Sequence, residues 1–423
     1  MNLPPSSPPR WYFGWNIVAS ASFLTLLTVG MRMGVGPFFL PMMDDLGLSR
    51  SELSFDIAVG MLCYGLAMPV AGYLIGRFGT RPVLLLGTAI VALACAWTAR
   101  ATGALEFLLV YGVLLSFGLG LTSPVALTPI LARWFTRRRG MALFFLSTGS
   151  MAGIAVMTPV FAWTVESFGW RETMLGYGLL YALVSVPLTL LVMSDAAPPE
   201  TDTLQGGSAP AAVRSAPKPG APLRVGDAVS SADFWKVALG LFTCGFSMNL
   251  LGTHGMPMLM DHGFDATSSS TGIGLIGLVA IFSTLVLGRI SDRVEKKHLL
   301  ATIYLVRGLG FFALVLVGTH WELYAAAAIG GIVWAGSIAM SSAILADVFG
   351  VRLVGVLYGL SYLGHQLGAA LSSWFGGWGY ERFGSHLPAF GAAGVLLIVA
   401  AGVSMKLPLQ GGASRAATAS PRP

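Results

Sequence analysis

Long apolar stretches dominate this chain and limit what it can fold into. A helix needs about 20 apolar residues to cross roughly 30 Å of hydrocarbon. Twelve stretches meet that requirement, at residues 14–41, 51–76, 81–100, 104–134, 138–165, 171–193, 232–260, 268–290, 297–317, 320–347, 352–380 and 386–406. Only 10% of the residues are charged, against about 25% in soluble proteins. The sequence therefore predicts an all-α membrane protein with twelve transmembrane helices.

Basic residues are concentrated on one side of these spans. Nineteen Lys and Arg residues fall on that side, whereas only four fall on the other, namely Arg50, Arg100, Arg171 and Arg382. The positive-inside rule places the basic side in the cytoplasm. We therefore expect a multi-pass protein of the plasma (inner) membrane, in contact with lipid, with both termini cytoplasmic. The basic run at 137–139 then lies in a short loop between spans, so no nucleic-acid partner is expected.

One polar segment separates two groups of six spans. Residues 194–231 are rich in Pro, Ala, Gly and Ser, which is typical of a flexible linker. The sequence thus predicts an N-terminal six-helix bundle at 1–193, a flexible cytoplasmic linker, a C-terminal six-helix bundle at 232–408, and a disordered cytoplasmic tail at 409–423.

The two groups of spans resemble each other. They align without gaps at an offset of 216 residues, so that "PMMDDLGLSRSELS" from Pro41 lies over "PMLMDHGFDATSSS" from Pro257. The pattern W-x-x-E-x-F-G also recurs at nearly the same offset, beginning at Trp163 and, 215 residues later, at Trp378. Repeated bundles of this kind are typical of transporters that hold their substrate near mid-membrane between the halves. We therefore expect two pseudo-symmetric bundles with a site between them.

The loop after the second span carries a known motif. The major facilitator superfamily has G-x-L-x-D-R-x-G-R-K there, and this chain has the matching residues Gly72, Leu74, Arg77, Gly79 and Arg81, with Gly76 in place of the Asp. The second half keeps the Asp-Arg pair as Asp292 and Arg293. The chain thus resembles that superfamily, most closely its monocarboxylate porter and oxalate/formate antiporter branch. The resemblance implies a conformational latch formed by Arg77, Arg81, Asp292 and Arg293.

Arg32 lies within the first predicted span. Thr28, Arg32 and Gly36 follow helical spacing and share one face. Because an arginine at the bilayer centre costs about 2.5–3.5 kcal/mol on insertion scales, such a residue is expected to face a wet interior. Arg32 either binds an anionic substrate, with Thr28 beside it, or pairs with Asp56 and joins two helices. Both roles are compatible, because a substrate carboxylate can compete with Asp56 for the guanidinium.

Polar residues also occur in the seventh and eleventh spans. His254 lies in the repeat equivalent of the first span, and His365 lies beside Tyr362 and Gln366 in the eleventh. These four residues are further candidates for substrate binding. If transport is coupled to protons, the carriers are His254, His365 or Asp56, since imidazole has an ordinary pKa near 6.5. The alternative for both histidines is a satisfied hydrogen bond inside a bundle.

The resemblance also bears on the substrate. Oxalate/formate antiporters hold a dicarboxylate between an Arg in the eighth span and a Lys in the eleventh, where this chain has Thr284 and His365. The Asp and Arg that monocarboxylate porters use in the eighth span are absent from residues 271–288. A monoanion held by Arg32 is therefore favoured over a dianion. Arg307, in the ninth span, has apolar helical neighbours and is interpreted as structural.

The sequence thus predicts a secondary active transporter for a small organic anion, most plausibly a monocarboxylate, working by alternating access with or without proton coupling. No ATP-binding motif of the G-x-x-x-x-G-K-[ST] type is present, and no catalytic constellation is visible, so neither ATP nor an enzyme is expected. Cys63, Cys95 and Cys244 each lie alone within a span, so no metal and no cofactor are expected. The alternative function is proton-driven efflux of hydrophobic or drug-like compounds by a Met-rich and aromatic pocket.

Overall fold

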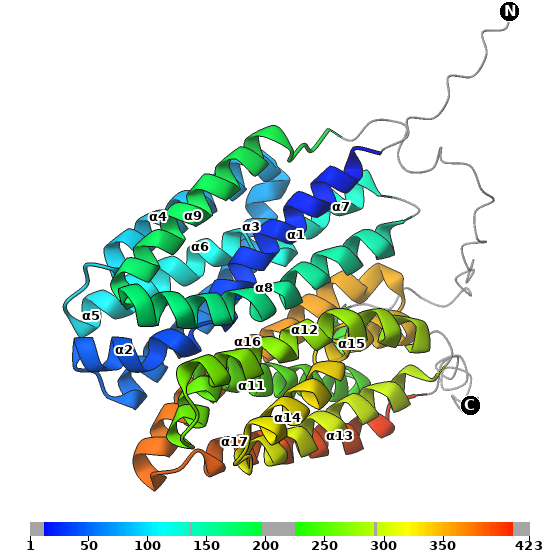
Figure 1. Cartoon of the computed structure of the whole chain (residues 1–423). Coiled ribbons are helices and arrows are strands. Elements are labelled where there is room, and N and C mark those ends of the chain that lie inside the picture. Colours follow the sequence, from blue (N-terminus) through cyan, green and yellow to red (C-terminus); the bar gives the residue numbers. More distant parts are fainter. Residues whose placement is uncertain (1–11, 136–137, 197–224, 292–293, 409–423) are drawn as a thin grey trace, which may run out of the picture.

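The protein consists of long helices arranged in two bundles (Figure 1). The computed structural model describes residues 12–135, 138–196, 225–291 and 294–408, and within them it contains helices and no strands. The first bundle contains α1 (Gly14–Met33), α2 (Gly36–Leu46), α3 (Arg50–Phe78), α4 (Thr80–Thr98), α5 (Ala104–Phe107), the π-helix η1 (Leu108–Leu115), α6 (Ser116–Leu121), α7 (Pro124–Trp134), α8 (Arg139–Phe168) and α9 (Trp170–Leu191). The second bundle contains α11 (Ala232–Asp261), α12 (Ala266–Ser291), α13 (Lys296–Val315), α14 (His320–Ile332), α15 (Gly336–Phe349), α16 (Val351–Phe383) and α17 (Leu387–Met405), preceded by the short α10 (Val225–Val229).

Eleven helical segments of the described chain are long and apolar enough to cross a membrane. They correspond to eleven of the predicted spans. The remaining predicted span is α16, whose 33 residues include the polar pair His365 and Gln366 in the middle. The chain is thus an all-α membrane protein, and its two halves follow the predicted repeat. Shifted by 216 residues, α3 falls on α12, α4 on α13, α8 on α16 and α9 on α17.

Three of the predicted spans are not single helices. The stretch 14–41 breaks between α1 and α2, the stretch 104–134 breaks between α6 and α7, and the stretch 320–347 breaks between α14 and α15. Pro37 and Pro124 account for the first two breaks, because proline donates no backbone hydrogen bond and clashes with the preceding turn. The third break has no proline.

The predicted linker boundaries also need correction. Ser194 and Asp195 are part of the first bundle: the Ser194 carbonyl accepts a hydrogen bond from Trp134 Nε1 at 2.6 Å, and Asp195 pairs with Arg133 at 2.5 Å. At the other end, α10 lies within the predicted linker and Ala228 is buried. Residues 197–224 and 409–423 lie outside the described residues.

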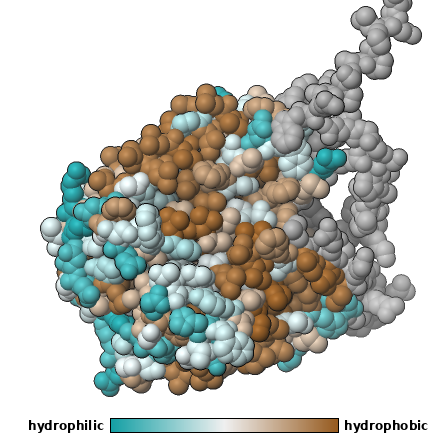
Figure 2. Space-filling model, in the orientation of Figure 1, coloured by the Kyte–Doolittle hydropathy of each residue, from teal (hydrophilic) through white to brown (hydrophobic). Residues whose placement is uncertain are grey.

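The surface has an apolar flank and a polar end. In Figure 2, hydrophobic side chains cover much of the flank, whereas hydrophilic ones gather at the left end, where Figure 1 shows α2 and α5. We call this end the far side, and the end at which α1 and α11 begin the tail side. A hydrophobic flank between polar ends is what a membrane protein requires.

The inter-bundle ion pair of the described chain lies on the far side. Arg50, at the start of α3, pairs with Asp261 at the end of α11 at 2.9 Å, and its guanidinium lies 3.8 Å from the centre of the Tyr380 ring. Ser51 donates its backbone N–H to Glu381 of α16 at 2.8 Å. On the tail side of the described chain, the ion pairs join residues of one bundle, as Lys296 and Asp347 do at 2.6 Å. Among the described residues, the ion pair that joins the two bundles is therefore a far-side contact.

Candidate functional site

Arg32 lies in the last turn of α1, directly before the break that Pro37 causes. Pro37 cannot donate a hydrogen bond to the carbonyl one turn earlier, and the chain turns at Gly34, whose N–H bonds to the Gly30 carbonyl at 2.8 Å. A cation is favoured at the carbonyl end of a helix by the helix dipole. The sequence around residues 32–37 therefore places a guanidinium at a helix end within the membrane.

The partners of Arg32 come from both bundles and carry no formal negative charge. Within the first bundle its Nε donates to Met61 Sδ at 3.4 Å, and the guanidinium lies 4.5 Å from the centre of the Tyr64 ring. Across the interface its NH2 group donates to Asn249 Oδ1 at 3.3 Å and to Gln366 Oε1 at 3.1 Å. No carboxylate of the described chain forms a salt bridge with it.

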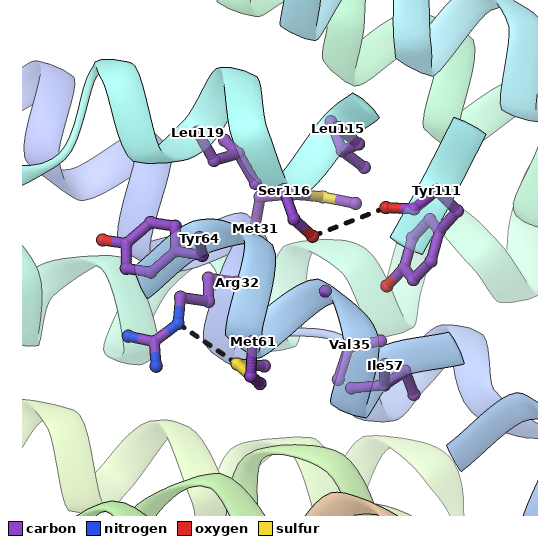
Figure 3. Close-up of a pocket in the computed structure, with 11 residues that line it drawn as sticks. Met31, Arg32, Val35, Ile57, Met61, Tyr64, Tyr111, Leu115, Ser116 and Leu119 are labelled. Carbon is purple, nitrogen blue, oxygen red and sulfur yellow. Dashed lines mark hydrogen bonds between the residues drawn. The ribbon is translucent and has the colours of Figure 1, made fainter. Parts of the chain in front are cut away.

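A pocket lies beside Arg32, between α1, α3 and the helices η1 and α6. Figure 3 shows Arg32, Met61 and Tyr64 on one side of it and Val35, Ile57 and Tyr111 on the other. The remaining lining residues are Met31, Gly60, Leu115, Ser116 and Leu119. Apart from Arg32, this lining is mainly apolar.

Two buried side chains of α16 have polar atoms that lack a partner next to Arg32. Gln366 Nε2 and His365 Nε2 are buried and have no hydrogen-bond partner in the described chain. Gln366 Oε1 lies 3.1 Å from His365 Nδ1, and the His365 ring stacks on Tyr362 at 4.8 Å. Arg32, Tyr362, His365 and Gln366 are thus brought together, as the sequence predicted.

Two other predicted site residues lie among different contacts. His254 Nε2 lies 2.7 Å from the Ser373 carbonyl oxygen, and its ring packs against Phe39 at 5.1 Å. Thr28 Oγ1 lies 2.9 Å from the Tyr181 hydroxyl inside the first bundle. None of these residues lines the pocket beside Arg32. In this conformation, therefore, His254 joins the two bundles and Thr28 joins helices within one bundle.

The predicted pairing of Arg32 with Asp56 is wrong. Arg32 reaches Met61 instead, which lies further along α3, away from the far side. The Asp56 side chain is 6% exposed, and no hydrogen bond or salt bridge to its carboxylate is found in the described chain. It lines a second cavity together with Glu52, Phe55, Leu108 and Trp374 among others.

The structure describes half of the predicted latch. Arg81 Nε donates to the Met193 carbonyl, and Arg77 donates to the Tyr73 hydroxyl at 3.5 Å. Both contacts stay within the first bundle. Asp292 and Arg293 lie outside the described residues.

Several residues of the site were not predicted. Met61 and Tyr64 lie in the second predicted span and do not stand out from its other side chains. Asn249 lies in the middle of the seventh span, where a lone amide side chain was an available signal. The far-side group of Arg50, Asp261 and His386 was missed as well. A signal existed for this group, because four basic residues on the sparsely charged side invite a search for acidic partners.

Comparison with known proteins agrees with the architecture. The family model described as "Major Facilitator Superfamily" matches residues 21–319 and 283–422. The chain is 25% identical over 384 residues to an uncharacterized MFS-type transporter, YcxA, of Bacillus subtilis (strain 168), covering 86% of this chain and 88% of the relative. It is 28% identical over 424 residues to monocarboxylate transporter 11 of Homo sapiens, covering 96% and 86%.

Solved structures share the fold at low identity. A D-xylose–proton symporter superimposes with a TM-score of 0.73 at 16% identity, covering 95% of this chain and 99% of that one. A bacterial homologue of the human lysosomal transporter Spinster, in an inward-facing and occupied conformation, gives a TM-score of 0.71 at 15% identity, covering 96% and 98%.

Proposed function

Because this chain belongs to the Major Facilitator Superfamily, whose members are membrane transporters and not enzymes, we propose that it carries a small monocarboxylate by alternating access, with Arg32 as the anchor of the carboxylate. The observation that carries the proposal is the environment of Arg32. A guanidinium at the interface of the bundles has Asn249, Gln366, Met61 and Tyr64 as partners, all formally neutral. Its charge therefore favours an anion that enters from solution.

Binding of a carboxylate would change the contacts between the bundles. Asn249 and Gln366 accept hydrogen bonds from the same NH2 group, so a carboxylate that takes the guanidinium replaces one or both of them. The amide nitrogen of Gln366 has no acceptor and is available to donate to the second carboxylate oxygen. The substrate then stands between a cation of one bundle and an amide donor of the other. This arrangement supports coupling of substrate binding to movement of the bundles.

A single carboxylate fits this site better than two. The one guanidinium balances one negative charge, and the neighbouring α16 side chains add the neutral groups of Tyr362 and Gln366. A second carboxylate would be desolvated without a cation, which is costly. The name of the human relative, a monocarboxylate transporter, supports the same substrate class.

Proton coupling is the second part of the proposal, and Asp56 is its best candidate. A buried carboxylate without a cation is costly to keep ionised, so uptake of a proton stabilises it. Its cavity is also lined by Ser51 and Glu52 at the far-side start of α3, which supports access to solvent from that side. His365 is the second candidate, because its Nε2 lacks a partner beside Arg32. His254 is less favoured, because a backbone carbonyl already occupies its Nε2.

The orientation follows from the charge distribution. We propose that the tail side is cytoplasmic, because most basic residues lie there, and that the protein resides in the plasma membrane. The predicted flexible linker and C-terminal tail then lie in the cytoplasm. Arg77 and Arg81, with Asp292 and Arg293, remain our proposal for a latch on that side.

Uptake into proteoliposomes tests the proposal. Purified protein is reconstituted and supplied with radiolabelled pyruvate, butyrate or oxalate, with and without an imposed proton gradient. We expect uptake of the monocarboxylates that competes with other monocarboxylates and is lost in Arg32→Gln. Uptake of oxalate alone, or transport of lipophilic cations without any carboxylate, would contradict the proposal and favour a dicarboxylate carrier or the efflux alternative.

Asp56→Asn separates transport from proton coupling. Exchange of labelled for unlabelled substrate needs no net proton movement, so we expect this variant to keep exchange and lose the stimulation by a proton gradient. Glu52→Gln, in the same cavity, serves as the matched control and should keep both activities. Full gradient-driven uptake by Asp56→Asn would remove Asp56 from the proposal.

A further inference from the structure

The pocket beside Arg32 defines what the rest of the substrate must be. We infer that it receives an apolar tail, so the preferred substrate is a monocarboxylate with a compact hydrocarbon chain. This inference rests on the proposed function, because it assumes that the carboxylate binds Arg32.

The lining of the pocket beyond Arg32 is mainly apolar, and its hydroxyl groups belong to Tyr64, Tyr111 and Ser116. Six of its eleven lining residues have aliphatic or thioether side chains, namely Met31, Val35, Ile57, Met61, Leu115 and Leu119. The hydroxyl of Ser116, at the start of α6, is directed at the carbonyl of Tyr111 in the preceding helix η1, 3.5 Å away (Figure 3). A second carboxylate on the substrate tail would lose its hydration without a second cation to compensate it.

The wall of the pocket is built by close contact between α3 and η1. A side chain at Gly60 would place its Cβ 2.6 Å from Ser116 Oγ, and one at Gly112 would place its Cβ 3.0 Å from the Asp56 carbonyl oxygen. These two glycines let the helices approach closely and fix the width of the pocket. Tyr111 and Leu115, which both line the pocket, belong to the π-helix η1. Segments of π-helix inside α-helices occur frequently at functional sites.

The first bundle supplies the whole lining of this pocket. All eleven residues belong to α1, α3, η1 and α6 or to the turn after α1, whereas Asn249 and Gln366 reach Arg32 from the second bundle. A substrate with its tail in the pocket would thus be held by the first bundle, while the second bundle contacts only its carboxylate. Selectivity for the length of the substrate's hydrocarbon chain would therefore depend on the first bundle alone. It would not depend on the contacts of Asn249 and Gln366, which change during transport.

The expected selectivity can be stated as a series. Burial of one methylene group is worth about 0.8 kcal/mol, which is about fourfold in affinity. We expect the inhibition constant against labelled butyrate to fall about fourfold per added carbon from acetate upward, until the pocket is full, and then to rise.

Variants at Leu115 test the inference in the reconstituted full-length protein. Leu115→Phe fills the pocket and should move the best chain length to shorter acids, whereas Leu115→Ala enlarges it and should move the best length to longer acids. Leu109→Phe is the matched control, because Leu109 lies on the same π-helix but is 53% exposed and does not line the pocket. It should leave the series unchanged.

The outcomes separate this inference from the proposed function. Carboxylate transport that depends on Arg32 but not on chain length would overturn the inference alone, as would a series that is the same in wild type and both Leu115 variants. If Leu115→Phe does not fold, Leu115→Ala decides by itself, because an unchanged series in that variant is enough to reject the pocket. Failure of the wild type to transport any carboxylate would overturn both.

Discussion

Two arginines at membrane depth stand next to helix breaks, and their surroundings differ in a way that separates structure from function. Arg307, on α13, is 1% exposed and donates its NH2 group to the carbonyls of Val333 and Trp334, the residues between α14 and α15. Arg32 stands before the break between α1 and α2, but its partners are side chains, two of them across the interface of the bundles. Arg307 thus satisfies backbone carbonyls that a helix break leaves free, whereas Arg32 is bonded to side chains that a ligand can replace.

The kind of acceptor that a buried arginine has distinguishes a structural role from a binding role. Backbone carbonyls freed by a helix break have no other donor within the bundle, so an arginine that satisfies them belongs to the fold. Neutral side chains on a facing bundle satisfy an arginine only as long as the bundles keep their arrangement. The structural interpretation of Arg307 is thereby confirmed, while the anion-binding role of Arg32 remains a proposal.

The largest expected effect is on folding, from Arg307→Leu. The variant leaves the carbonyls of Val333 and Trp334 without a donor, at a cost of about 1–3 kcal/mol for each buried group. We expect a lower melting temperature in detergent, followed by tryptophan fluorescence and size-exclusion chromatography. Arg307→Lys should recover part of the loss. An unchanged melting temperature in Arg307→Leu would show that the break does not need this arginine.

The next largest effect is on transport, from Arg32→Gln. Charge-assisted hydrogen bonds contribute about 1.5–3 kcal/mol, so carboxylate uptake at low substrate concentration should fall roughly 10- to 100-fold. The melting temperature should change much less than in Arg307→Leu, because no backbone group loses its partner. The comparison fails if Arg32→Gln is as unstable as Arg307→Leu and still transports at the rate of the wild type.

A smaller effect is expected from Gln366→Leu. This variant removes an acceptor of Arg32 and a free amide donor, and it keeps the charge of Arg32. We expect the KM for a monocarboxylate to rise about tenfold, with little change in the melting temperature. Leu363→Ala, an exposed position of the same helix, is the control. A KM that is equal in Gln366→Leu and in the control would remove the second bundle from the binding site.

The smallest effect is expected on the pH dependence of stability, at the ion pair of Arg50 with Asp261. Unlike Arg32, Arg50 has a carboxylate partner. His386 directly precedes the membrane-spanning helix α17, Leu387–Met405, and therefore lies outside the span as the structure defines it. It lies 2.9 Å from the carboxylate of Asp261, the partner of Arg50, and burial lowers the pKa of this histidine below its ordinary value. Below about pH 6.5 the unfolded chain binds a proton at His386 more readily than the folded one, so stability falls as the pH is lowered. Melting curves between pH 7.5 and 5.5 should show this decline. His386→Gln should decline less, and an equal decline would contradict this reasoning.

The sequence predicts the fold well, because its signals are local. Apolar stretches define the spans, and the 216-residue repeat pairs α3 with α12 and α8 with α16. The interior position of Arg32 was also predictable, from the cost of exposing it to lipid. Pro37 indicated a possible helix break after Arg32. Whether a single proline breaks a membrane helix depends on how the neighbouring helices pack against it.

The partners of Arg32 could not be predicted, because they depend on how far the helices slide past one another. Asp56 lies on the expected neighbouring helix, yet Arg32 contacts Met61, five residues further along. Asn249 and Gln366 lie 217 and 334 residues away in the chain, and only the docking of the bundles brings them together. The π-helix η1 likewise has no recognisable signal in the sequence "LLVYGVLL".

The most direct test of the account is carboxylate-induced stabilisation of the purified full-length protein. Melting temperatures are recorded for wild type and Arg32→Gln with increasing butyrate, oxalate or sodium chloride, since a ligand that binds the folded state raises the midpoint. The account predicts that butyrate stabilises the wild type in a saturable manner, that oxalate and chloride do so less, and that the butyrate effect disappears in Arg32→Gln. Equal stabilisation of wild type and Arg32→Gln by butyrate would contradict the central role given to Arg32.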